Sequence, residues 1–294
     1  MTSPGIRPAT VACLGPRGTF SEEALRRALG GADSEVEIVP ADSNRDVVLA
    51  VENGLADAAF VPIENSVEGA VTETLDALVH EAPNTQIVGE LVWPVHHCLI
   101  AAPGTTLDSV KTVASHPQAL AQSSRFLNEQ LASAARVNEA STAEAVRDAV
   151  SRGDGYAAIG SSAAADAYSG VVLADAIEDS AGNKTRFVWL AKDNLNVNWL
   201  GTSHDAPHKT SAVFAGFNDT SPGALVGILS EFADRSVNLS KIESRPERTQ
   251  LGHYLFFVDI DGASSEQSVG DALAAVETKV RNLRVLGSYP AYEG

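Results

Sequence analysis

The chain has 294 residues, of which 44% are hydrophobic and 20% are charged, so its composition is that of a soluble globular protein with room for two or three domains. Its formal net charge of −17, without any run of lysine or arginine, disfavours binding to nucleic acid or to anionic lipid. No segment approaches the roughly 18 apolar residues of a membrane span, and the N-terminal MTSPGIRPAT lacks the apolar core of a secretory signal, so we expect cytoplasmic residence.

The cysteines and the paired histidines do not indicate a metal site. Cys13 and Cys98 lie far apart in apolar, strand-like segments, which favours packed thiols over a disulfide. His96 and His97 are adjacent, and neighbouring side chains of a strand point to opposite faces, so the pair makes a poor chelate. We therefore expect no structural zinc.

Residues 9 to 81 alternate short β-branched segments with amphipathic ones. In chain order these read ATVACLG, TFSEEALRRAL, EVEIVPA, NRDVVLAVENG, ADAAFVP and VTETLDALVH. Such alternation indicates βα units and a mostly parallel sheet. The next segment, residues 86–101, is a long extended run interrupted by Pro94, and it suits a crossing from one lobe to another.

A second alternating block follows, with strands predicted at KTVASH, AARVNEA, GYAAIG and VVLADAI and helices between them. TRFVWLA, residues 185–191, is then one more strand, which we expect to return the chain to the first lobe. Two lobes with a double crossing enclose a cleft. We place the first lobe at residues 1–85 plus 177–195, the second lobe at residues 86–176, and a linker at residues 196–208.

The character of the sequence changes after this linker. KTSAVFAGF reads as a strand, and Ser221-Pro222 reads as the cap and first residue of a helix. The strands VNLSKIES and GHYLFFVDI, a helix with four apolar residues on one face, and the strand LRVLGSY complete the order βαββαβ. This order is the ferredoxin-like split βαβ arrangement, so we predict a separate α+β domain at residues 209–294.

Four strands before residue 190 end in loops of small or hydroxylated residues that begin helices: GPRGTF, ENSVEG, SHPQ and GSSAA. Parallel α/β sheets bind ligands at this edge, because helix N-termini present free N–H groups there. We therefore predict an anion site, and its candidate residues are Thr19, Asn65, Ser66, Ser115 and Ser161. Helix capping alone also explains each of these residues, and that alternative stays open.

The segment NKTRF, residues 183–187, sets a hydroxyl, a guanidinium and an aromatic ring side by side, which suits a small carboxylate ligand. Glu64 and His116 are candidate acids or bases, although a salt-bridged carboxylate and a structural histidine are the alternatives. The sequence contains no Walker loop, GxGxxG or HExxH, and no Ser/His/Asp order. These observations favour chemistry on a small anion without a cofactor.

Five segments, in this order, closely resemble the prephenate dehydratase domain: GPRGTFSEEA (15–24), VPIENSVEGAV (61–71), SHPQAL (115–120), STAEAV (141–146) and NKTRF (183–187). GALVGIL (223–229) and ESRP (243–246) resemble the ACT regulatory domain that accompanies it. The resemblance implies a two-lobed, periplasmic-binding-protein-like α/β catalytic domain over residues 1–195, followed by a ferredoxin-like ACT domain. It also implies the monofunctional form.

The activity implied by the resemblance is that of a hydro-lyase, which converts prephenate to phenylpyruvate with loss of carbon dioxide and water in phenylalanine biosynthesis, without metal or cofactor. Thr185 matches the family's essential threonine, placed to donate a hydrogen bond to the leaving hydroxyl. Arg186 would pair with a substrate carboxylate, and Phe187 would pack near the ring. The other implied site residues are Asn65, Ser115 and Gln122, with Ser66, Thr142, Ser161 and Glu64 as further substrate-binding candidates.

In the ACT domain, the resemblance implies a phenylalanine site at the interface between two subunits of a homodimer or homotetramer. Its residues would be Gly223, Ala224 and Leu225 at a helix start, and Glu243, Ser244, Arg245 and Pro246 at a strand end. We predict that phenylalanine favours a closed, less active arrangement of the two lobes.

Two alternatives stay open. Arogenate dehydratase acts on the aminated analogue, and nothing in one sequence separates the two substrates. A cytoplasmic protein that binds a small anion or amino acid without turnover would share the two-lobed cleft.

Overall fold

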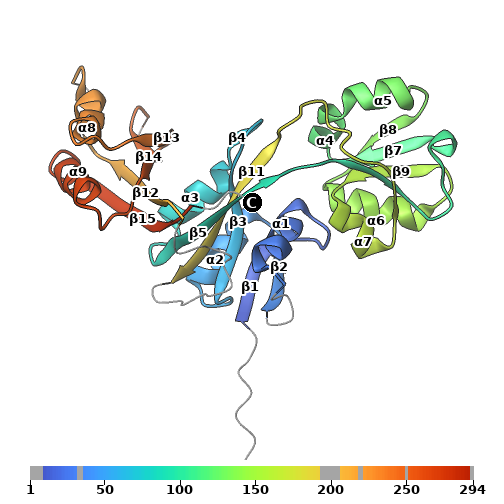
Figure 1. Cartoon of the computed structure of the whole chain (residues 1–294), viewed down its shortest axis with the longest axis horizontal. Coiled ribbons are helices and arrows are strands. Elements are labelled where there is room, and N and C mark those ends of the chain that lie inside the picture. Colours follow the sequence, from blue (N-terminus) through green and yellow to red (C-terminus); the bar gives the residue numbers. More distant parts are fainter. Residues whose placement is uncertain (1–8, 32–35, 193–205, 218–220, 249–250, 292–294) are drawn as a thin grey trace, which may run out of the picture.

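The computed structural model describes residues 9–31, 36–192, 206–217, 221–248 and 251–291. These residues form three β-sheets with helices packed against them, and Figure 1 shows the three parts side by side, with the C-terminal part on the left and the second lobe on the right. The expected architecture, two α/β lobes and a βαββαβ domain, is confirmed. Of the predicted linker at residues 196–208, residues 196–205 lie outside the described residues.

The first sheet has the strand order β2-β1-β3-β11-β5, and a short β4 pairs with β3. Its strands β1, β2 and β3 are parallel, and β11 runs antiparallel between β3 and β5. The strands are β1 (Ala9–Leu14), β2 (Val36–Ala41), β3 (Ala58–Asn65), β4 (Gly69–Ala70), β5 (Thr85–Pro94) and β11 (Lys184–Lys192). The helices are α1 (Phe20–Leu29), α2 (Asn44–Glu52) and α3 (Thr72–His80).

The second sheet has the order β10-β6-β9-β7-β8, in which β7, β8 and β9 are parallel. Its strands are β6 (Cys98–Ala101), β7 (Thr112–Ser115), β8 (Ala135–Asn138), β9 (Tyr156–Gly160) and β10 (Val171–Ala174). The helices of this lobe are α4 (Pro117–Gln122), α5 (Ser124–Gln130), α6 (Thr142–Arg152) and α7 (Ser162–Tyr168).

The chain crosses between the lobes later than we expected. We placed the boundary at residue 85, but β5 pairs with β11 along its whole length and belongs to the first sheet. Ile87 and Leu91 of β5 are buried against the two faces of that sheet, so the strand cannot leave it without exposing them. The outward crossing therefore falls at residues 95–97, and β11 returns the chain to the first sheet, as predicted (Figure 1).

The C-terminal sheet has the order β13-β14-β12-β15. Its elements are β12 (His208–Ala215), α8 (Ala224–Ala233), β13 (Leu239–Pro246), β14 (Tyr254–Asp261), α9 (Gln267–Glu277) and β15 (Asn282–Pro290). One face of the sheet packs on α8 and α9, while Val213, Leu255 and Phe257 on the other face join the core of the first lobe. This domain is therefore docked through an apolar interface.

The docking is closest where β15 crosses β5. A Cβ atom at Gly287 would lie 2.0 Å from the carbonyl oxygen of Ile87, so only glycine permits this approach of the two backbones. Among the described residues, no helix has the length and apolar character to span a bilayer.

Candidate active site

A cleft of about 270 Å³ lies between the two lobes. It is lined by residues from the end of β1 and the start of α1, by the facing ends of β3 and β11, by the crossing segment, and by the starts of α4 and α6. The polar lining residues are Thr19, Ser21, Asn65, His97, His116, Gln118, Gln122, Ser141, Thr142, Asn183 and Thr185. None of the described lining residues is a lysine or an arginine.

Helices α1 and α6 both begin at this cleft. Their caps, Thr19 and Ser141, accept hydrogen bonds from the backbone N–H groups of Glu22 and Glu144. The remaining N–H groups of each first turn have no partner within the helix, and the helix dipole adds partial positive charge. The cleft can therefore attract an anion without any full positive charge in its wall.

The hydroxyl of Thr185 is oriented by Asn65. The backbone N–H groups of Val67 and Glu68 donate to Asn65 Oδ1 at 2.9 and 3.0 Å, which identifies that atom as the oxygen. Asn65 Nδ2 then donates to Thr185 Oγ1 at 2.8 Å and to Asn183 Oδ1 at 2.9 Å. Because Thr185 accepts in this pair, its own proton is free to be donated to a ligand in the cleft.

A bulge in β3 brings Asn65 to the face of Thr185. Arg186 pairs with Glu64 and Phe187 pairs with Pro62, so Ile63 has no partner on β11. The extra residue reverses the side-chain alternation beyond it. Ile63 is buried in the core that the first lobe shares with the C-terminal domain, yet Asn65, two residues on, faces the cleft on the opposite side.

Gln122 connects the two lobes across the cleft. Its Nε2 donates to Glu68 Oε1 at 3.2 Å, in the turn that follows β3, and its Oε1 lies 2.9 Å from His97 Nε2. Since a carboxylate only accepts, Gln122 Oε1 faces the histidine and Nε2 of His97 carries the proton. Asn65, Glu68, Gln122 and His97 thus form one network that spans both lobes.

His97 is held neutral by its surroundings. Burial lowers its pKa, and the hydrogen bond with Gln122 and the charge of Glu178 offset this effect only in part. Its Nδ1 is buried without a hydrogen-bond partner in the described part of the chain, so a proton added there would lack an acceptor. In the sequence, His97 stands out only as one of two adjacent histidines that are poorly placed to bind a metal together. It reaches the cleft because it lies in the segment that crosses between the lobes.

Three predicted serines hold the frame of the site and do not line the cleft. Ser115 is buried and donates to Ile159 O at 2.7 Å, which ties β7 to β9. Ser161 caps α7 and donates to Gly18 O at 2.8 Å, which ties the second lobe to the first. Ser66 accepts from the backbone N–H of Lys184 at 2.9 Å. For Ser161 the capping alternative describes the observed contacts.

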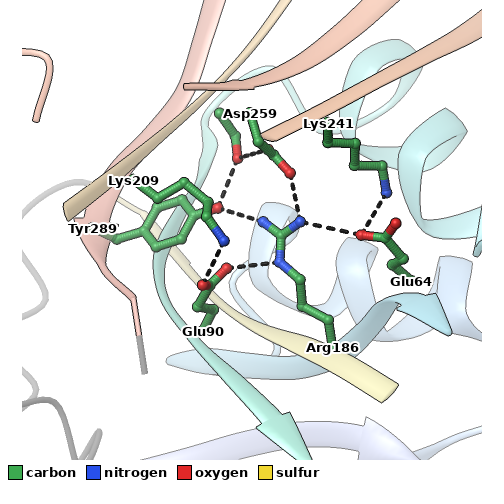
Figure 2. Close-up of polar contacts among 8 residues, drawn as sticks. Glu64, Glu90, Arg186, Lys209, Lys241, Asp259 and Tyr289 are labelled. Carbon is green, nitrogen blue, oxygen red and sulfur yellow. Dashed lines mark hydrogen bonds and ion pairs between the residues drawn. The ribbon is translucent and has the colours of Figure 1, made fainter. Parts of the chain in front are cut away.

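Arg186, Phe187 and Glu64 also lie away from the cleft, contrary to the direct substrate contacts that we expected for them. Alternation along β11 turns Arg186 toward the C-terminal domain, where its guanidinium is occupied by protein acceptors (Figure 2). Phe187 is buried and stacks on Phe60 with ring centroids 5.0 Å apart. Glu64 pairs with Arg186 and Lys241.

Several cleft residues escaped the sequence-based prediction of binding residues, among them Phe20, Ser21, His97, Gln118, Ser141 and Asn183. Asn183 and Ser141 lie within segments that carried the family resemblance, so the segment was found and the residue was not. No group of three or more histidine, cysteine, aspartate or glutamate side chains suited to a metal ion occurs in the described ranges.

The predicted regulatory residues occupy two places in the C-terminal domain. Gly223 has φ of 83° and caps α8, which begins with Ala224 and Leu225. The segment Glu243–Pro246 ends β13, the edge strand of its sheet. Arg245 from this segment donates two hydrogen bonds to Asp76 of α3, at 3.1 and 2.8 Å, so one end of β13 is tied to the first lobe.

Comparison with known proteins gives matches along most of the chain. Residues 11–195 match the family model for prephenate dehydratase, and residues 217–278 match the model for the ACT domain. A protein from Methanocaldococcus jannaschii named prephenate dehydratase is 37% identical over 279 residues, which cover 95% of this chain and 97% of that protein. Arogenate dehydratase 5 of Arabidopsis thaliana is 39% identical, over 95% of this chain and 67% of its own length.

The solved structures include a prephenate dehydratase from Arthrobacter aurescens in complex with L-Phe. It is 37% identical, with a TM-score of 0.84, and the alignment covers 96% of this chain and 90% of that one. Since the family model covers more than half of the chain and these relatives match both parts of it, the chain belongs to the prephenate dehydratase family, with a C-terminal ACT domain.

Proposed function

We propose that this protein catalyses the decarboxylating dehydration of prephenate to phenylpyruvate and that phenylalanine regulates it through the ACT domain. The observation that carries the proposal is the Thr185 hydroxyl, fixed as an acceptor by Asn65 and facing a cleft at which helices α1, α4 and α6 begin. Family membership supplies the substrate class. The cleft supplies a means to hold a dianion without cationic side chains.

In the bound substrate, the two carboxylates would take the N–H groups at the starts of α1 and α6, next to Thr19 and Thr142. Gln122 would close the cleft over the ring through its bond to Glu68. Such placement holds the ring hydroxyl and the ring carboxylate in fixed positions, which accounts for most of the catalysis that a strongly favourable aromatisation requires.

In the reaction, the bond between the ring and its carboxylate breaks, and the electron pair moves into the ring as the C–O bond to the hydroxyl breaks. The hydroxide leaves as water after it takes one proton from solvent, and carbon dioxide is the other product. We assign Thr185 the donation of a hydrogen bond to the departing oxygen. One preorganised donor of this kind contributes about 10²- to 10³-fold in rate.

Of the site residues predicted from the sequence, this proposal keeps Thr185, Asn65, Gln122 and Thr142 at the substrate. Ser115, Ser161 and Ser66 support the frame of the site through the bonds described above. Phe187, two residues after Thr185 in β11, packs on Phe60, and Glu64 and Arg186 act from the other face of the sheet.

For regulation, we propose that phenylalanine binds near Gly223–Leu225 and Glu243–Pro246, between two copies of the chain. The related Arthrobacter structure contains L-Phe. The edge strand β13 and the exposed Val226 on α8 offer a surface for a second copy. We further propose that the protein is a homo-oligomer, with a catalytic domain at residues 1–195 and a regulatory domain at residues 209–294. We also propose cytoplasmic residence, since the buried free thiols of Cys13 and Cys98 suit a reducing compartment.

The test is formation of phenylpyruvate from prephenate by the purified full chain, with arogenate as a parallel substrate and phenylalanine titrated into each. Turnover of prephenate in preference to arogenate supports the proposal. Preference for arogenate would identify the protein as an arogenate dehydratase. Folded protein that turns over neither substrate would favour a binding protein.

A further inference from the structure

Arg186 is the centre of a buried polar cluster between the first sheet and the C-terminal sheet (Figure 2). Its guanidinium donates to Glu90 at 2.7 Å, to Asp259 at 2.5 Å and to the Tyr289 hydroxyl at 2.9 Å. The side chains of Arg186, Glu90 and Asp259 are 9%, 3% and 7% exposed. All three guanidinium nitrogens of Arg186 therefore donate to protein acceptors, at a site that water hardly reaches.

Five further contacts extend this centre into the Arg186 cluster. Lys209 pairs with Glu90 at 2.7 Å, and Ser211 donates to Asp259 at 2.5 Å and lies 2.7 Å from the Tyr289 hydroxyl. Glu64 lies 3.4 Å from Arg186 and 3.1 Å from Lys241. The members are Glu64, Glu90, Arg186, Lys209, Ser211, Lys241, Asp259 and Tyr289, so three cations face three anions and every strand of the C-terminal sheet contributes.

Such a cluster has a different consequence from the apolar contacts around it. A buried ion pair adds little stability compared with well-packed apolar side chains, but removal of one partner leaves a buried charge unpaired. Apolar surfaces tolerate small sliding movements, whereas the planar arginine fork requires a fixed geometry of its acceptors. The cluster therefore specifies one placement of the C-terminal sheet against the first lobe.

The same cluster touches the cleft through the backbone. Arg186 directly follows Thr185 in β11, and Glu64 directly precedes Asn65 in β3, while β11 pairs Thr185 with Asn65 and Arg186 with Glu64. One face of this short ladder carries the side chains of Thr185 and Asn65, and the other face carries the ion pair of Arg186 and Glu64. A shift of the ion pair therefore moves the Thr185 hydroxyl and the Asn65 amide that orients it.

We propose that Arg186 is a positioning residue, and that the Arg186 cluster sets the geometry of Thr185 and Asn65 according to the placement of the C-terminal sheet. The kinetic consequence rests on the proposed function. Strand β13 carries both Lys241, which binds Glu64, and the segment Glu243–Pro246. A ligand that moves β13 therefore acts directly on the cluster.

The experiment compares Asp259→Asn with Asp261→Asn in the full chain. Both changes remove one carboxylate from β14, but Asp261 is exposed and bonds to Asn238, outside the cluster. We expect Asp259→Asn to lower kcat for prephenate by about 10- to 100-fold, since misplacement of a reacting group by about 1 Å has effects of this size, with KM changed less than about threefold. Asp261→Asn should behave as wild type.

Tyr289→Phe is the second variant, because it keeps every charge and nearly all of the volume. It removes only the hydroxyl between Arg186 and Ser211. We expect L-phenylalanine to bind this variant with unchanged affinity in calorimetry, while its effect on kcat falls at least severalfold. If both Asp259→Asn and Tyr289→Phe fold and keep wild-type kcat and phenylalanine response, the inference is wrong.

Amide hydrogen exchange provides a readout that does not depend on activity. We expect Asp259→Asn to accelerate exchange in residues 63–66 and 184–187, and Asp261→Asn to leave it unchanged. If wild-type protein shows no turnover but this exchange pattern is observed, the proposed function is rejected, while the coupling of the Arg186 cluster to Thr185 and Asn65 stands. Unchanged exchange in Asp259→Asn would reject the coupling between the Arg186 cluster and the strand segments that carry Thr185 and Asn65.

Discussion

Asn65 donates a hydrogen bond of 2.8 Å to Thr185 across the β3–β11 ladder, and this direction leaves the threonine proton available to a ligand. The direction is fixed because two backbone N–H groups already occupy Asn65 Oδ1. A hydroxyl otherwise rotates to suit its neighbours, so the fixed amide of Asn65 is what defines the donor role of Thr185.

Replacement of Thr185 by valine keeps the shape of the side chain and removes the hydroxyl. We expect kcat for prephenate to fall by about 10²- to 10³-fold with little change in KM, as for the loss of one donor that acts in the transition state. Thr185→Ser retains the donor and should keep most of the activity. Steady-state kinetics of the two variants decides the matter, and an active Thr185→Val would remove Thr185 from the mechanism.

Asn65→Asp tests the hydrogen-bond direction. A carboxylate at this position only accepts, so Thr185 would donate its proton to residue 65 and lose it for the substrate. The added charge would also repel an anion in the cleft. We expect both a lower kcat and a higher KM than in wild type, whereas Asn128→Asp, on the exposed surface of α5, should leave both unchanged. Equal kinetics in all three proteins would contradict the assigned direction.

Acid should weaken the fold through His97. Its pKa in the folded protein is lowered, chiefly by burial, so the unfolded chain binds a proton more readily. Its contribution to stability is therefore complete above its ordinary pKa of about 6.5 and is lost as pH falls through the lower folded value. The groups that act on it are Glu178 and His96, with Gln122 as its hydrogen-bond partner.

Denaturant unfolding between about pH 7 and pH 4.5 measures this effect, since the window spans the ordinary histidine pKa of about 6.5 and the range below it. The free energy of unfolding should fall more steeply in wild type than in His97→Gln, which can still donate to Gln122 but does not titrate. His208→Gln, an exposed change on β12, should match wild type. Parallel curves for wild type and His97→Gln would show that His97 does not carry the dependence.

Gly287→Ala should loosen the docking of the ACT domain. The new methyl group would meet the backbone carbonyl of Ile87, which cannot move without disturbing β5. We expect a loss of about 1–3 kcal/mol in the free energy of unfolding, as for overpacking of a well-packed core. Gly270→Ala, in α9, finds its nearest atom at 3.4 Å and should be neutral or stabilising. Calorimetry of both variants compares the two sites.

The amino-acid sequence by itself determined the order and type of the main elements. Alternating periodicity and hydroxylated caps such as Thr19 and Ser141 act within a few residues of chain, so they can be read from the sequence. The same local signals placed Thr19 and Asn65 at one sheet edge, while the family resemblance implied Gln122, Thr142 and Thr185, and all five line the cleft. Segment similarity then indicated the family.

Only the tertiary structure decided which face each side chain occupies. Arg186 follows Thr185 directly, but the strand turns it into the ACT interface, and the acceptors that receive it lie up to 103 residues away in sequence. The bulge at Ile63 reverses the alternation of β3 and so exchanges the faces of Glu64 and Asn65. Strand register and domain docking depend on contacts between segments that are distant in sequence, so a local sequence pattern does not predict them.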